Sequence, residues 1–164
     1  MTDFGRAIEA GDLEDVEAFI ENDPAIVDQV IRGDSYPLFV AAMYGQCEVA
    51  KLLLRRGARV DAADDNGGTP LMAAAEEGSA DMVRLLLAHG ANARTRDHDL
   101  SPFGGETALH CAAKNGHEEA AALLLAAGAD VQVKDNNGET ALGRAVAGDH
   151  AGVVELLRQH GGRE

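Results

Sequence analysis

A ten-residue pattern of apolar and small residues, closed by glycine, occurs several times along the chain. It reads YPLFVAAMYG at 36–45, TPLMAAAEEG at 69–78 and TALHCAAKNG at 107–116, and it begins again at Thr140. The starts at 36, 69, 107 and 140 are 33, 38 and 33 residues apart, so the period is 33 with five extra residues before the block at 107. A degenerate copy fits residues 2–11. A fixed period of this length predicts an array of similar structural units.

Each unit is predicted to hold two helices. A threonine at the start of the block can cap a short first helix with its side-chain oxygen. The glycine at the end can adopt the left-handed backbone that ends this helix. A Leu-rich run and a second glycine then predict a second helix. Paired alanines within the blocks would let helices of adjacent units approach closely. We expect the packing residues to include Leu38, Leu71, Leu109 and Leu142.

Polar residues replace packing or turn residues in the outermost units. Asp15 stands where Val49 and Met82 stand in inner units, and Arg158 stands where other units have leucine. Asp149 replaces the glycine that ends the first helix. A finite stacked array needs polar outer faces, so these changes favour capping units at both ends.

The repeated block resembles the ankyrin repeat family, whose signature is a 33-residue unit of two helices and a β-turn with a Thr-Pro-Leu-His core. Four blocks in register carry the resemblance, and it covers nearly the whole chain. It implies an all-α solenoid of helix-turn-helix units joined by β-hairpin-like turns, forming a single domain over 1–164. The implied units are approximately 1–33, 34–64, 65–96, 97–134 (with a loop insertion at 97–106) and 135–164.

The charge balance narrows the classes of partner. The chain has 14 Lys and Arg against 28 Asp and Glu, a formal net charge of −14. Nucleic acid and anionic membrane surfaces are disfavoured, because both attract basic proteins. Residues 1–33 hold nine of the acids against two arginines, which is half of the excess. This charge either solvates the terminal unit or steers a basic protein towards it.

The cysteines and the hydropathy pattern bear on location. Cys47 and Cys111 are too few for a disulfide scaffold, which favours a reducing compartment. No run approaches the roughly 20 apolar residues of a membrane span, and the N-terminus lacks the pattern of a secretory signal. We therefore expect a cytoplasmic protein.

The six histidines are the strongest candidates for chemistry, and five of them follow the repeat. His117 and His150 are equivalent, His89 and His160 close second helices, and His110 occupies the fourth position of the Thr-Ala-Leu-His core. Structural roles are expected for these five, and the resemblance implies that His110 braces loop against helix. We predict no catalytic residue, no metal and no cofactor, hence a non-enzymatic protein.

One segment keeps an enzymatic alternative open. Among the histidines only His98 is off the repeat pattern, and with Asp97 and Asp99 it forms three adjacent potential ligands in the inserted segment. An enzyme or a metal-binding protein would need a convergent site there. Adjacent residues rarely converge on one ion without further ligands, so a solvated loop is the preferred interpretation.

The resemblance implies that partners bind at the hairpin tips and on the exposed face of the first helices. The tip candidates are Asn66, Asn136 and Asn137. The helix-face candidates are Tyr36, Val40, Met43, Tyr44, Glu76, Glu77 and Lys114. The second unit concentrates the aromatic residues, which either anchor a partner or compensate for an irregular first unit.

The inserted segment adds two apolar candidates, Leu100 and Phe103. They either fold back onto the groove or contact a partner, since long loops in compact proteins are often functional. The resulting prediction is a monomeric protein-protein interaction module that recognises a protein or peptide. The main alternative is a stoichiometric inhibitor or immunity-type protein that masks a basic enzyme, and an adaptor role is equally compatible.

Overall fold

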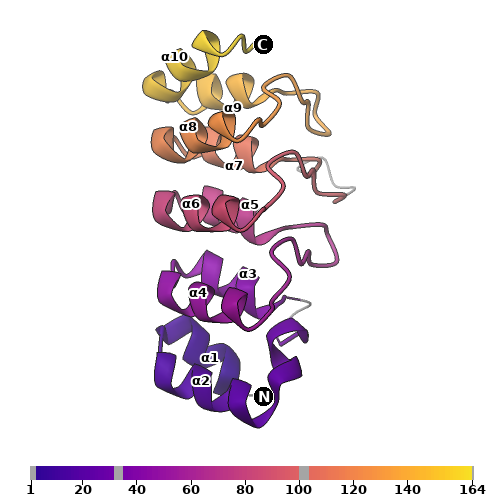
Figure 1. Cartoon of the computed structure of the whole chain (residues 1–164). Helices are drawn as coiled ribbons and strands as arrows, with labels where there is room; N and C mark the ends of the chain where they lie inside the picture. The colour runs from indigo at the N-terminus through magenta and orange to yellow at the C-terminus, as the bar shows by residue number, and fades with distance from the viewer. Residues whose placement is uncertain (1–2, 32–34, 100–103, 164) are drawn as a thin grey trace.

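Paired helices stack along one axis in the computed structural model, which describes residues 3–31, 35–99 and 104–163 (Figure 1). The pairs are α1 (Asp3–Ala10) with α2 (Leu13–Asn22), α3 (Pro37–Met43) with α4 (Cys47–Arg55), α5 (Pro70–Glu76) with α6 (Ala80–Ala88), α7 (Ala108–Lys114) with α8 (Glu118–Ala126), and α9 (Ala141–Ala147) with α10 (Ala151–Gln159). A short 3-10 helix, η1 (Pro24–Asp28), follows the first pair. The all-α solenoid predicted from the repeat is confirmed.

The first helices begin and end where the sequence predicts. Thr69 Oγ1 accepts a hydrogen bond from the Met72 amide at 3.3 Å, and Thr140 Oγ1 accepts one from the Gly143 amide at 3.3 Å. The predicted threonine caps are therefore present in these two units. Each cap satisfies an amide that has no partner within its own helix.

The core lies between successive pairs, and it consists mainly of alanine and leucine. The first helices pack in one row, α1 on α3, α3 on α5, α5 on α7 and α7 on α9, and the second helices pack in a parallel row. The predicted leucines are at most 2% exposed: Leu38, Leu71, Leu109 and Leu142. Small residues on the first helices allow this close stacking, so each unit is stabilised by its neighbours.

The expectation that Val40 is exposed is wrong. Its side chain is buried with 6% exposure, as are Ala73 and Cys111 at the same position of the next two units. Glu106, from the segment before α7, lies against Cys111 with Oε2 at 3.8 Å from Sγ. This side of the first helix of each of these units is therefore covered, and its side chains become exposed only in the last turn.

The last pair shows the polar substitutions predicted for an end unit. Asp149 adopts a left-handed backbone with φ 57°, at the position where inner units have glycine. Arg158 is exposed, and Val146 is 39% exposed although its equivalents Ala75 and Ala113 are fully buried. Val146 differs because no following helix packs against it among the described residues.

Side chains at the start of the second helices link one unit to the next. Three of them donate a hydrogen bond to the carbonyl at the end of the preceding first helix, or close to it: Gln46 to Glu9 at 2.8 Å, His117 to Glu76 at 2.9 Å and His150 to Lys114 at 2.9 Å. This confirms the structural role predicted for the two histidines. In the third unit the equivalent residue is Ser79, whose hydroxyl instead accepts from the Met82 amide at 3.4 Å.

Replacing Ser79 with histidine should add a hydrogen bond to the end of α3, which the shorter serine side chain does not make among the described residues. A Cβ built at Gly45 meets no atom within 4 Å, whereas the same space at Gly78 is filled by the His117 ring. An imidazole at position 79 therefore has room to reach the end of α3. We expect the free energy of unfolding of Ser79→His to exceed that of Ser79→Ala by about 0.5–1 kcal/mol in urea titrations. Both variants lose the bond from the Met82 amide to the Ser79 hydroxyl, so equal stability of the two would contradict this role.

Candidate partner-binding face

Apart from the buried Val40, the candidate residues on the first helices lie at the ends of α3, α5 and α7. Met43 is 40% exposed and Tyr44 is 50% exposed. Glu76 and Glu77 occupy the equivalent positions one unit further and are exposed, while Lys114 is half-buried one unit beyond them. We call the surface formed by these five side chains the inner face.

Tyr36 lies before α3 and is half-buried. Its ring is covered by the Arg59 guanidinium, whose carbon lies 5.2 Å from the ring centroid. Arg59 is itself held by Asp28, with Nε donating to Oδ2 at 2.9 Å. The contact joins the linker after α4 to η1 and to the approach to α3. The structure therefore gives Tyr36 an internal packing role beside any contact with a partner.

The three tip asparagines differ in how far they are free to contact a partner. Asn66 and Asn137 are exposed, and their backbone amides donate to Asp64 and Asp135. Asn136 is also exposed, but its side chain donates to the Asp99 carbonyl at 2.8 Å and accepts from Arg96 at 2.9 Å. Its side chain thus joins the inserted segment to the next hairpin.

The carboxylate of Asp97 is occupied by its own loop. It accepts hydrogen bonds from the backbone amides of Asp99, Gly105 and Glu106 at 3.1, 2.7 and 2.9 Å. Asp64 and Asp135 do the same at the base of their hairpins, so Asp97 follows the repeat. His98 is exposed, and no group of three His, Cys, Asp or Glu able to hold a metal occurs within the described ranges. Leu100 and Phe103 lie outside the described residues.

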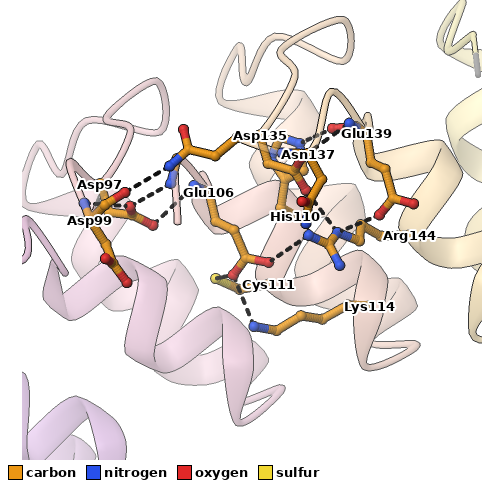
Figure 2. Close-up of polar contacts among 12 residues, drawn as sticks. Asp97, Asp99, Glu106, His110, Cys111, Lys114, Asp135, Asn137, Glu139 and Arg144 are labelled. Carbon is orange, nitrogen blue, oxygen red and sulfur yellow. Dashed lines mark hydrogen bonds and ion pairs between the residues drawn. The ribbon is translucent and has the colours of Figure 1, made fainter. Parts of the chain in front are cut away.

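A network of charged side chains lies between the hairpins and α7 and α9 (Figure 2). Lys114 Nζ lies 2.9 Å from Glu106 Oε2 and 3.3 Å from Glu76 Oε1, so two carboxylates share one ammonium group. Burial alone would lower the pKa of Lys114, but its hydrogen bond to Glu106 and the nearby acids raise it above the ordinary value. Lys114 therefore stays a cation.

The second part of the network is centred on Arg144. Its guanidinium donates to Asp135 Oδ2 from Nε at 2.8 Å and lies 3.0 Å from Glu139 and 3.9 Å from Glu106. Asp135 has no exposed side-chain surface. Burial alone would raise the pKa of Asp135, but the amides of Glu139 and Asn137 and the Arg144 guanidinium hold it below the ordinary value. The network fixes the last hairpin onto α9.

Sequence reasoning missed this network. The aspartates of the hairpins, Asp64, Asp97 and Asp135, follow the repeat spacing and could have been found as a structural series. Glu106 and Glu139 also occupy equivalent positions, 33 residues apart, but the Arg144 that both approach stands where other units have Val40, Ala73 and Cys111, so only proximity in space shows that it joins them.

His110 braces the fourth unit, as the resemblance implies. Its Nδ1 accepts from the Thr107 amide at 3.2 Å and lies 2.9 Å from the Thr107 hydroxyl. Its Nε2 lies 3.2 Å from the Glu139 carbonyl and donates to it, which fixes the tautomer. Burial lowers the pKa of His110. The neutral ring thus links the start of α7 to the next hairpin.

The low pKa of His110 predicts a loss of stability on mild acidification. The unfolded chain binds more protons than the folded chain between the ordinary pKa of about 6.5 and the lower folded value. The stability that the neutral His110 contributes is fully present above the ordinary pKa, and it is lost as the pH falls towards the lower pKa of the folded chain. Between pH 7.5 and 5.5 the free energy of unfolding should fall more in the wild type than in His110→Gln. Equal falls in both proteins would contradict the assignment.

Neither cysteine has the environment of a reactive thiol. Burial raises the pKa of the Cys111 thiol, and burial also raises the pKa of Cys47, with the Asp81 charge adding to it. Both thiols are free. Low-pKa thiolates are the nucleophilic form of cysteine, so this arrangement does not support cysteine chemistry.

Stacked helix pairs, threonine caps, left-handed glycines and projecting turns define a helical repeat protein. A family model described as ankyrin repeats (3 copies) matches residues 4–97 and 96–163. The chain belongs to the ankyrin repeat family, as the sequence pattern predicts. A search of curated proteins finds no match.

Ankyrin repeats are generally protein-protein interaction modules and are generally non-enzymatic. Each helix in the described part of the chain is too short or too polar to cross a bilayer.

Proposed function

We propose that this chain binds a protein or peptide through its inner face and the tips of its hairpins. One observation carries the proposal. Met43, Tyr44, Glu76 and Glu77 project from positions that stacking does not use, while the preceding residues of the same helices are buried. Solenoid repeats present such surfaces as extended binding sites.

The test is affinity capture from the native cell with the full chain as bait. A variant with Met43→Ala, Tyr44→Ala, Glu76→Gln and Glu77→Gln should lose a specific partner by at least about tenfold, which corresponds to about 1.4 kcal/mol. The matched control changes two exposed apolar and two exposed acidic residues of the first unit and its linker: Leu13→Ala, Val30→Ala, Glu14→Gln and Glu21→Gln. Equal capture by both variants would overturn the proposal.

Inhibition of a basic enzyme is the second candidate, and the distribution of charge favours it. The first unit carries half of the net −14 charge, and Glu14, Asp15 and Glu21 are exposed on α2. An electrostatically steered inhibitor associates much more slowly as salt rises, because screening removes the long-range attraction. A steep fall in association rate between 20 and 500 mM salt would favour this role, whereas a flat profile would favour an apolar groove binder.

A further inference from the structure

The inner face changes its chemistry from one unit to the next. At the end of α3 it carries Met43 and Tyr44, which are 40% and 50% exposed. The same two positions at the end of α5 hold Glu76 and Glu77. Because α3 packs directly on α5, the apolar pair and the acidic pair lie side by side on neighbouring helices. A partner that covers one pair therefore meets the other.

The apolar pair is separate from the other exposed apolar side chains. Leu13, Val30 and Val146 are also exposed, but they belong to α2, to the segment after η1 and to α9. Met43 and Tyr44 are adjacent in the chain, and they occupy the last helical position and the cap of α3. Methionine and tyrosine both contribute large contact areas to protein interfaces. This pair offers an apolar contact at the second unit.

The acidic pair keeps unneutralised negative charge. Glu76 lies 3.3 Å from Lys114, but that ammonium group is already 2.9 Å from Glu106. Glu77 forms no ion pair with any described residue and is exposed. Two carboxylates therefore share one cation, and Glu77 adds a further negative charge. A cation on a partner would complete this pairing, whereas an acidic group would be repelled.

We propose that the inner face selects a partner segment that places an apolar side chain on Met43 and Tyr44 and a Lys or Arg beside Glu76 and Glu77. The proposal rests on the proposed function and adds the chemistry of the partner to it. Packed helices lie roughly 8–10 Å apart, so the two groups of the partner are separated by about that distance. Residues seven apart on a helix or three apart on a polyproline II segment meet this requirement.

The test is selection of random 16-residue peptides displayed on phage against the full chain, followed by affinity measurement of the selected synthetic peptides. Selected peptides should be enriched in Lys or Arg at a fixed spacing from an apolar residue. Glu76→Gln with Glu77→Gln should weaken their binding by about tenfold or more. The matched control, Glu14→Gln with Glu21→Gln on α2, should change affinity less than twofold. Met43→Ala with Tyr44→Ala should also weaken binding at least about tenfold.

The other outcomes separate this inference from the proposed function. Suppose that the selected peptides lose affinity for the Met43→Ala, Tyr44→Ala variant. If they carry no cation, or bind the Glu76→Gln, Glu77→Gln variant as tightly as the wild type, the inference of a cationic partner is overturned. The inner face would then still be the binding surface. Peptides indifferent to both pairs of changes would overturn the inference and count against the proposed function. Failure to select any peptide would count against the inference alone, since a folded partner could still use the face. Unchanged urea unfolding of each variant shows that the fold is intact.

Discussion

Asp135→Ala should destabilise the chain by about 3–5 kcal/mol, because it removes the fully buried partner of an ion pair. The Asp135 carboxylate accepts from the Asn137 amide at 2.8 Å and the Glu139 amide at 3.0 Å, and it holds Arg144. Alanine leaves both amides without this acceptor and removes the closest counter-charge of a largely buried guanidinium. Equilibrium urea unfolding measures the loss.

Asp64 provides the matched control for Asp135. It accepts from two amides of its own hairpin, Asn66 at 2.9 Å and Gly68 at 2.8 Å, at the equivalent position of the third unit. No arginine pairs with it among the described residues. Asp64→Ala should therefore cost only about 1–2 kcal/mol. Equal losses in the two variants would show that the ion pair contributes nothing beyond the amide bonds.

Gly116→Ala should destabilise the chain by about 3 kcal/mol for two separate reasons. Gly116 has φ 75°, where an alanine costs roughly 1–2 kcal/mol because its Cβ meets the backbone. A Cβ at this position would also overlap the His150 ring. The ring would have to move and lose its bond to the Lys114 carbonyl, which adds about 1 kcal/mol. Thermal or urea unfolding reports the sum.

Gly45 separates these two contributions. It has φ 67° at the equivalent position, but a Cβ there meets no atom within 4 Å. Gly45→Ala should show the backbone cost alone, about 1–2 kcal/mol. In a His150→Ala background, the destabilisation caused by Gly116→Ala should fall to the same value. If Gly116→Ala remains as costly in that background, the imidazole is not the cause.

The fold was predictable because a stacked array repeats its own constraints. The threonines and glycines recur with a 33-residue spacing at positions with the same structural role in each unit. The pattern in one unit therefore supports the assignment of the next. The histidines that follow the repeat, such as His117 and His150, were assigned correctly for this reason. Their hydrogen bonds run between equivalent positions of neighbouring units.

The details of the candidate face were less predictable, because exposure depends on what lies across the stack. Val40 was expected on the surface, but the side of α3 that it occupies is covered. Asn136 was expected to be a tip contact, and its side chain also holds the inserted segment through Asp99 and Arg96. Arg144 lies 38 residues from Glu106 and stands where the other units have valine, alanine or cysteine, so its pairing with Glu106 has no repeat counterpart. A periodic pattern identifies positions that recur, and it cannot pair residues that occur once.

Among the described residues, Ser79 does not bond the end of α3 as its equivalents bond the preceding first helix, and this affects how the array unfolds. In a linear array, stability is a sum of terms for units and for junctions, so partial opening begins at the most weakly coupled junction. Among the described residues, the junction between the α3–α4 and α5–α6 pairs therefore lacks a side-chain bond to the end of the preceding first helix that its neighbours have. Met43 and Tyr44 lie on one side of this junction, and Glu76 and Glu77 lie on the other. A partner bound to both pairs would close the junction from outside, and we expect amide hydrogen exchange in α3 and α5 to slow on binding.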